Sequence, residues 1–344
     1  MLGTFRFALA CFVVMFHIGS FPLPFGTYSV QCFYVVSGYL ITAVLNESYA
    51  SRPAAFWINR FLRLYPQYYA VAAISLLAIV LLPKAAASYH SVWVVDTSPI
   101  SIASQIAIFP FAVASPAMRL VPPVWSVAIE LINYFILWIF AARSWRHASV
   151  AFGAGLAIHA YLLCAELDWG ARYFFWYAAI LPFAIGSLAY FGRTILLRTR
   201  TRAIACTLWV CNLAAASWIT SYLHAPMFWY TTVLWYANMI FAAFIVVHFA
   251  AKRKAPLADR WLGDLAYPIF LSHWTLSFLV ATWFAIAPHS LRLLLASAVP
   301  ILLFSTLLAY GSRAIIDRYR DKIRAGISTD RSDAEQVVML TSQR

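Results

Sequence analysis

The chain has 344 residues, of which 63% are hydrophobic and only 11% are charged. An ordinary soluble domain carries about a quarter charged residues, so this composition excludes that class and predicts a polytopic membrane protein. The net charge of +13 indicates a nucleic-acid partner only if the basic residues gather on one surface. The five cysteines lie in apolar runs without metal-ligand spacing, and we expect no metal site and no bound cofactor.

Ten apolar stretches are long enough to form membrane-spanning helices. The connection between the third and fourth stretches is long, and residues 100–113 within it are predicted to form a short re-entrant or interfacial helix. We therefore expect an all-α membrane domain over residues 1–311 and a basic, partly disordered tail over residues 312–344. The ten stretches cover roughly residues 4–22, 28–46, 64–83, 124–142, 148–165, 173–192, 203–221, 229–250, 263–286 and 291–311.

The basic residues fall mostly on one side of these ten spans. With the N-terminus placed in the cytoplasm, 21 of the 25 lysines and arginines lie on the cytoplasmic side. Such an excess marks the cytoplasmic face of a membrane protein, so both termini are predicted to be cytoplasmic and topology accounts for the net charge. The other four basic residues are Lys84, Arg119, Arg172 and Arg292.

Two ionisable residues interrupt the first apolar stretch. Arg6 and His17 are 11 residues apart, which places them within ~20° of one helix face and ~16 Å apart along the axis. Ionisable groups inside a span are candidate functional residues. The structural alternative is an arginine that reaches the headgroups and a histidine that hydrogen-bonds to a neighbouring helix.

Glu130 is the one carboxylate deep within a predicted span. Counted from the span ends, His17 lies ~20 Å from the inner boundary and Glu130 ~10 Å below the outer one, which is the same depth in a ~30 Å core. His273 comes out close to that level. We therefore expect His17 and Glu130 to share one cavity, within hydrogen-bond or one-water reach, with the carboxylate orienting the imidazole. A purely structural hydrogen bond between helices is the alternative.

Arg60 and Arg63 lie just before the third span, three residues apart on one helix face. Together with Arg6 they could form a trio of guanidinium groups, which suit the bidentate binding of phosphate. The alternative is the routine basic flank of a membrane span.

Five motifs in this order resemble those of the acyltransferase-3 family of integral membrane acyltransferases, which modify bacterial surface and exported glycans. The resemblance covers most of the chain. One departure is Gly3, which stands where the family often has an acidic residue. The motifs are Arg6-x10-His17, the stretch 26–41 with Ser37, Arg60-Phe-Leu-Arg63-Leu-Tyr65-Pro66, Trp125-Ser126-x3-Glu130 with Tyr134, and the stretch 263–273 with Tyr267 and His273.

The resemblance implies a multi-pass enzyme of the bacterial inner membrane. It would use cytoplasmic acyl-CoA, most often acetyl-CoA, as co-substrate and a glycan hydroxyl as acceptor. Exopolysaccharide, O-antigen and lipid-linked oligosaccharide are candidate acceptors, and glycan assembly proteins are candidate partners. His17 would act as general base or nucleophile with the help of Glu130, and Arg6, Arg60 and Arg63 would bind the donor. The remaining motif residues would support the site: Ser37, Tyr65, Trp125, Ser126, Tyr134, Tyr267 and His273.

Two other functions stay open on the sequence. A buried glutamate and histidine also suit a proton-coupled transporter or flippase for a lipid-linked oligosaccharide, although the chain shows neither repeated halves nor paired broken helices. A non-catalytic membrane partner of a glycan assembly machine is the third possibility. The donor group could be succinyl in place of acetyl.

Overall fold

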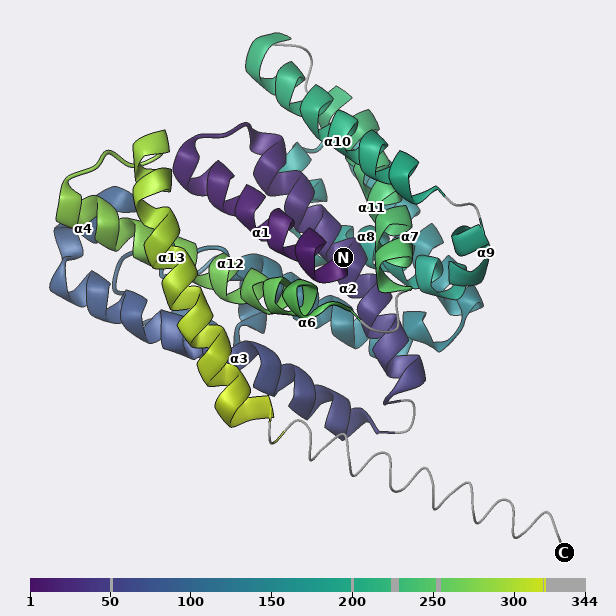
Figure 1. Ribbon diagram of the computed structural model, residues 1–344, viewed down its shortest axis with the longest axis horizontal. Helices are drawn as coiled ribbons and strands as arrows, with labels where there is room; N and C mark the ends of the chain where they lie inside the picture. The colour runs from purple at the N-terminus through teal and green to yellow at the C-terminus, as the bar shows by residue number, and fades with distance from the viewer. Residues whose placement is uncertain (50–51, 199–200, 224–228, 252–254, 318, 320–344) are drawn as a thin grey trace, which may run out of the picture.

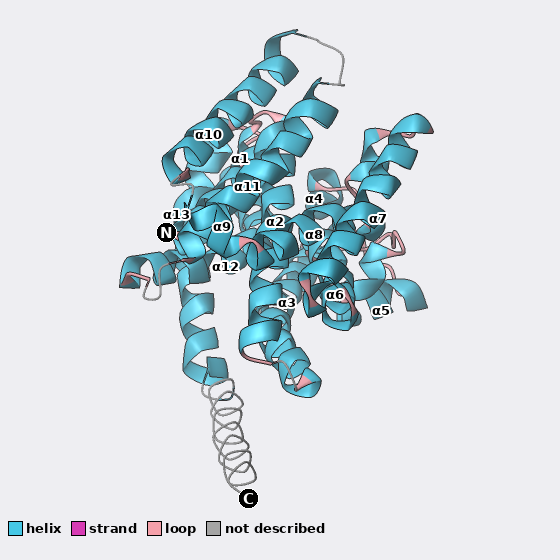
Figure 2. Ribbon diagram, turned by 90° about the vertical axis from the view of Figure 1, so that its right-hand side faces the viewer, coloured by secondary structure: helices cyan, strands magenta, loops and turns pink. Residues whose placement is uncertain are grey.

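The computed structural model describes residues 1–49, 52–198, 201–223, 229–251, 255–317 and 319. Throughout these residues the protein is helical and contains no strand (Figures 1 and 2). The predicted all-α class is therefore confirmed, and the protein is a polytopic membrane protein. Most of the tail after residue 311 lies outside the described residues.

Eight helices of the described chain are long and apolar enough to cross a membrane, and two shorter apolar ones accompany them. All ten overlap the predicted spans, although the third helix begins at Pro53, 11 residues before the predicted start at residue 64. The short helices α6, Val124–Ile139, and α8, Trp176–Phe191, have 16 residues each, which is ~24 Å at 1.5 Å per residue. The long helices are α1 Leu2–Gly19, α2 Leu23–Glu47, α3 Pro53–Leu81, α7 Trp145–Cys164, α10 Arg202–Trp218, α11 Leu234–Ala250, α12 Leu257–Phe284 and α13 Leu291–Ser312.

The long connection before α6 folds into short helices, as the sequence predicts for part of it. Helix α4, Pro83–Tyr89, directly follows α3, and α5, Pro99–Ala107, leads into a 3-10 turn at Phe109–Ala112. The hydroxyl of Ser98 accepts a hydrogen bond from the backbone N–H of Ser101 and so caps α5. A further short helix, α9, Arg193–Arg198, follows α8.

Helices α1 and α12 pack at close range near their N-terminal ends, where glycines face each other. A Cβ atom built on Gly3 would lie 1.7 Å from the carbonyl oxygen of Asp259, and one built on Gly263 would lie 2.9 Å from the Cα atom of Gly3. Only glycine fits at these positions. The Asp259 carboxylate also accepts hydrogen bonds from the backbone N–H of Thr4, at 2.8 Å, and from its hydroxyl. The first turn of α1 has Gly3 and no acidic residue. The carboxylate of Asp259, on α12, lies there instead.

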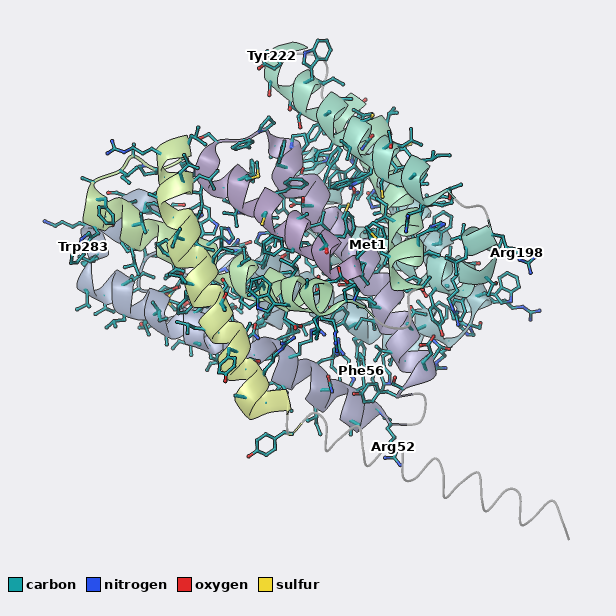
Figure 3. All side chains as sticks on the ribbon, viewed as in Figure 1. Met1, Arg52, Phe56, Arg198, Tyr222 and Trp283 are labelled. Atoms are coloured by element: carbon teal, nitrogen blue, oxygen red, sulfur yellow. The ribbon has the colours of Figure 1, made fainter. Side chains whose placement is uncertain are left out.

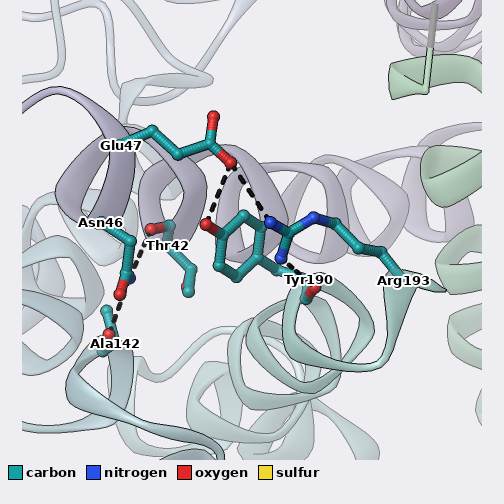
Figure 4. A network of polar contacts seen from close by, with 6 residues as sticks. All are labelled: Thr42, Asn46, Glu47, Ala142, Tyr190 and Arg193. Carbon is teal, nitrogen blue, oxygen red and sulfur yellow. Dashed lines mark hydrogen bonds and ion pairs between the residues drawn. The ribbon is translucent and has the colours of Figure 1, made fainter.

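Helix α2 lies in the middle of the bundle and packs against α1, α6, α8 and α11 (Figures 1 and 2). Its C-terminal end is tied to α8 by the polar network in Figure 4. The Glu47 carboxylate accepts a hydrogen bond from the Tyr190 hydroxyl at 2.9 Å and forms an ion pair with Arg193. The Asn46 amide donates to the carbonyl oxygens of Thr42 and Ala142. These contacts hold α2 in place, and α2 contributes Ser37 to the candidate active site.

Four of the side chains labelled in Figure 3 lie at the edges of the view. Trp283 and Tyr222 project at the left and top, and Arg52 and Arg198 project at the lower right and right. The sequence places the first pair at the outer membrane face and the second at the cytoplasmic face.

Candidate active site

A cavity of about 230 Å³ lies between α1, α2, α3, α6 and α12. One part of its wall is polar, and the rest consists mostly of aliphatic and aromatic side chains of α2 and α12, with Leu64 of α3 and Val127 of α6. Polar and titratable groups from all five sequence motifs thus reach one space. The polar residues of the wall are Arg6, Ser37, Arg60, Arg63, Ser126, Glu130, Tyr134, Tyr267 and Tyr34.

Three guanidinium groups converge on this cavity, as the sequence predicts. Arg6 comes from α1, and Arg60 and Arg63 come from successive turns of α3. Arg6 and Arg63 also line a smaller adjoining pocket together with Gln67 and Arg313. Convergence of this kind favours an anionic ligand, because guanidinium groups bind phosphate or carboxylate through paired hydrogen bonds.

Glu130 lies among these arginines. Its carboxylate accepts hydrogen bonds from the Tyr134 hydroxyl at 2.6 Å and the Ser37 hydroxyl at 3.3 Å. Arg6 and Arg63 are close enough to attract it electrostatically, although the described residues show no ion pair at contact distance between them. Glu130 therefore belongs to the arginine end of the site.

The imidazole of His17 has a different partner. Its Nδ1 atom lies 2.9 Å from Nε2 of His273, and the two rings are nearly parallel. His17 does not line the arginine cavity, and it makes no direct hydrogen bond to Glu130 within the described chain. The expected shared cavity and a direct hydrogen bond between His17 and Glu130 are thus not found, and a contact through one water stays a prediction. Equal depth along two helices does not determine which neighbouring helix each side chain faces, so the depth comparison could not establish a shared cavity.

The cavity and the histidine pair are neighbours along α12. Phe270 lines the cavity and lies one turn before His273, with 6.2 Å between the two ring centroids. Phe33 of α2 packs edge-on against Phe270 and lines the same wall. An apolar wall therefore leads from the arginine end toward the histidines and ends at these two phenylalanines.

The ring of Trp274 contacts His17 and also two histidines of the connecting segments, His90 and His289. The Trp274 ring centroid lies 5.3 Å from that of His17 and 4.7 Å from that of His90, and the ring of His289 is also adjacent. Burial, with the nearby Arg119, lowers the pKa of His90, which therefore stays neutral near pH 7. His90 and His289 were not among the sequence candidates, because both lie in connecting segments and belong to no motif.

Two of the predicted supporting residues do not line the cavity. The Tyr65 hydroxyl donates to the carbonyl oxygen of Ala107 at 2.6 Å, and its ring lines a more open groove between α3 and α6, which Arg60 also lines. Trp125 packs against Tyr173 and Phe174. Both residues hold helices together around the site.

The remaining supporting residues lie where a role in the site is possible. Ser37, Ser126, Tyr134 and Tyr267 line the cavity, and the Tyr267 hydroxyl also donates to the carbonyl oxygen of Leu64. Arg313 belongs to none of the motifs and lies in the segment predicted to be the basic tail. It forms an ion pair with Asp264 at the adjoining pocket.

Comparison with known proteins gives one match to a protein family. The family model described as an acyltransferase domain, acyltransferase-3, matches residues 2–311. No curated protein and no solved structure matches the chain. The match includes all ten apolar helices and every residue of the cavity. The chain therefore belongs to the acyltransferase-3 family and is a membrane-bound acyltransferase.

Proposed function

We propose that the protein transfers an acyl group, with acetyl the first candidate, from cytoplasmic acyl-CoA to a hydroxyl group of a glycan at the bacterial inner membrane. The observation that carries this proposal is the convergence of Arg6, Arg60 and Arg63 on a cavity whose apolar wall leads to the neighbours of His17. Acyl-CoA combines a phosphate-bearing end with a long, less polar arm and a thioester, and the cavity offers matching surfaces in that order.

The donor would enter from the side of Arg6 and Arg63. Its diphosphate would bind the guanidinium groups, and the pantetheine arm would follow the apolar wall of α2 and α12. A cavity of about 230 Å³ is smaller than most small-molecule sites, which span ~300–1,000 Å³. The cavity would therefore hold the acyl group and the pantetheine arm of the donor, and the adenosine part would stay outside. The charge distribution supports a cytoplasmic entrance.

His17 would perform the chemistry. As a general base it would take the proton of the glycan hydroxyl, whose oxygen attacks the thioester carbonyl carbon. The carbon–sulfur bond then breaks, and the CoA thiolate receives the proton from the imidazolium. In the nucleophilic route the ring nitrogen would attack the thioester carbonyl carbon, and the carbon–sulfur bond would break to release the CoA thiolate. The glycan hydroxyl would then take the acyl group from the imidazole, and its proton would go to the thiolate. Both routes give the glycan ester and free CoA.

Glu130 would act on the donor side. Its hydrogen bonds to Tyr134 and Ser37 hold it beside Arg6 and Arg63. A buried group of like charges is costly without a counter-charge. We propose that Glu130 balances the arginines when no donor is bound and keeps them aimed into the cavity.

Purified protein mixed with acetyl-CoA tests the proposal. Release of CoA thiol and transfer of radiolabelled acetyl to an extracted surface glycan should both depend on the protein. A strain lacking the gene should lose an ester from one surface glycan, and that loss would identify the acceptor. If neither acetyl-CoA nor succinyl-CoA is bound or consumed while the protein is folded, the proposed donor is wrong.

A further inference from the structure

A short chain of hydrogen bonds runs from His17 into the backbone of α12. Nδ1 of His17 lies 2.9 Å from Nε2 of His273. Nδ1 of His273 lies 2.8 Å from the carbonyl oxygen of Phe270 and 3.2 Å from that of Ile269. The side chain of His273 is fully buried, so this chain has fixed geometry.

The chemistry of the atoms fixes where the protons are. A carbonyl oxygen only accepts hydrogen bonds, so Nδ1 of His273 carries a proton. No carboxylate contacts His273 among the described residues, and a buried imidazolium without a counter-charge is costly, so His273 is neutral. Its Nε2 atom is then an acceptor, and the proton between the two rings belongs to Nδ1 of His17.

We infer that His273 is a positioning residue that holds His17 in the tautomer protonated on Nδ1. Nε2 of His17 is then the unprotonated, basic nitrogen, and it has no hydrogen-bond partner within the described chain. The side chain of His17 is partly exposed, and in the proposed reaction Nε2 is the nitrogen that meets the hydroxyl or the thioester. The backbone carbonyl oxygens of Phe270 and Ile269 accept the hydrogen bond from Nδ1 of His273 and so hold its ring in place. This inference rests on the proposed role of His17 as base or nucleophile.

The alternative is that His273 only packs against His17. Two substitutions separate the possibilities. H273F keeps a ring of similar size beside His17 but removes the acceptor. H273Q removes the ring but keeps an amide oxygen able to accept from His17 and an N–H able to donate to the backbone. A packing role predicts better function in H273F, and a positioning role predicts better function in H273Q.

The test measures the tautomer directly and the kinetics beside it. Full-length protein labelled with ¹⁵N-histidine in detergent micelles is studied by NMR, and His17→Gln identifies the signals of His17. The wild type should show His17 protonated on Nδ1 alone. H273F should move part of the population to the Nε2 proton and lower kcat by ~10–10³-fold, less than the ~10⁴ known for a wrong tautomer in a triad with a charged partner. The donor KM should stay within about twofold, because His273 does not contact the arginines. H273Q should keep the wild-type tautomer and more activity than H273F.

The inference is overturned if wild-type His17 carries its proton on Nε2, or if H273F retains the tautomer and the kcat of the wild type. A loss of kcat in H273Q equal to that in H273F, with the tautomer unchanged in both, overturns it as well. Should H273F fail to fold, the wild-type and H273Q spectra still decide the tautomer. Failure of the proposed function would be visible separately, as absence of acyl transfer by the wild type whatever its tautomer.

Discussion

Nδ1 of His17 lies 2.9 Å from Nε2 of His273, and no direct hydrogen bond joins His17 to Glu130 in the described chain. The site thus has two parts. Glu130 lies with the arginines at one end of the cavity, and the histidine pair lies past Phe270 at the other. Substitutions at the two ends should therefore change different kinetic constants.

Glu130→Gln should destabilise the empty protein more than it slows the chemical step. The amide can still accept from the Tyr134 hydroxyl, but the counter-charge of Arg6 and Arg63 is lost. We expect a lower thermal midpoint without donor, a larger upward shift on adding CoA than in the wild type, and a kcat within about tenfold of the wild type. A glutamate acting in proton transfer would instead be worth ~10²–10⁴ in rate.

Thermal unfolding with and without CoA, together with steady-state kinetics, checks this prediction. The matched control is Ser37→Ala, which removes a hydrogen bond to Glu130 and leaves the charge in place. A hundredfold fall in kcat for Glu130→Gln with unchanged thermal stability would contradict the assignment. It would favour an indirect link from Glu130 to His17.

Phe270→Ala should widen the range of acyl groups that the enzyme accepts. Phe270 closes the apolar wall next to His273, where the acyl group of a bound donor would lie. A pocket discriminates by ~1–3 kcal/mol for each methylene group, or ~10–200-fold. We expect kcat/KM for butyryl-CoA relative to acetyl-CoA to rise by about tenfold or more.

Kinetics with a series of acyl-CoA chain lengths tests this expectation, with Phe270→Leu as a more conservative variant that should give a smaller change. The corresponding change at Phe174, which is exposed and packs on Trp125, is the control. An unchanged preference in both Phe270 variants would place the acyl group elsewhere.

The orientation of the chain can be tested by fusing topology reporters to loops. The charge distribution predicts a cytoplasmic reading at Ala251 and an extracytoplasmic one at Ser91. Fusions after these residues to alkaline phosphatase and to a fluorescent protein give opposite signals on the two sides. A cytoplasmic reading at Ser91 would reverse the proposed entrance for acyl-CoA.

The positions of the helices could be predicted from the sequence because ten apolar stretches are marked by composition and length alone. The arginine trio could also be predicted, since Arg60 and Arg63 share one face and flank a span near Arg6. The identity of neighbouring helices could not. His17 meets His273 because α1 packs on α12, and that packing depends on the close approach of Gly3 and Gly263, which no periodicity reveals.

The same limit applies to Glu130, Tyr65 and Trp125. Depth counted along each helix placed Glu130 level with His17, but depth does not say which side of a helix faces which neighbour. Tyr65 and Trp125 belong to motifs that reach the site, yet their own side chains point to Ala107 and to Tyr173. Membership of a motif indicates a region of the fold and leaves the direction of each side chain undetermined.

The central claim is that the first helix separates donor binding, at Arg6, from chemistry, at His17. Calorimetric titration of acetyl-CoA, with turnover measured in parallel, tests it in the wild type, Arg6→Ala and His17→Ala. Arg6→Ala should weaken donor binding by ~10–150-fold, which corresponds to ~1.5–3 kcal/mol for a charge-assisted contact. Arg6→Lys should recover only part of it, because an ammonium group lacks the planar fork.

His17→Ala should lose ~10²–10⁴ of the turnover while donor affinity stays within a few-fold of the wild type. The opposite pattern would contradict the account: donor binding lost in His17→Ala and a normal donor KM in Arg6→Ala.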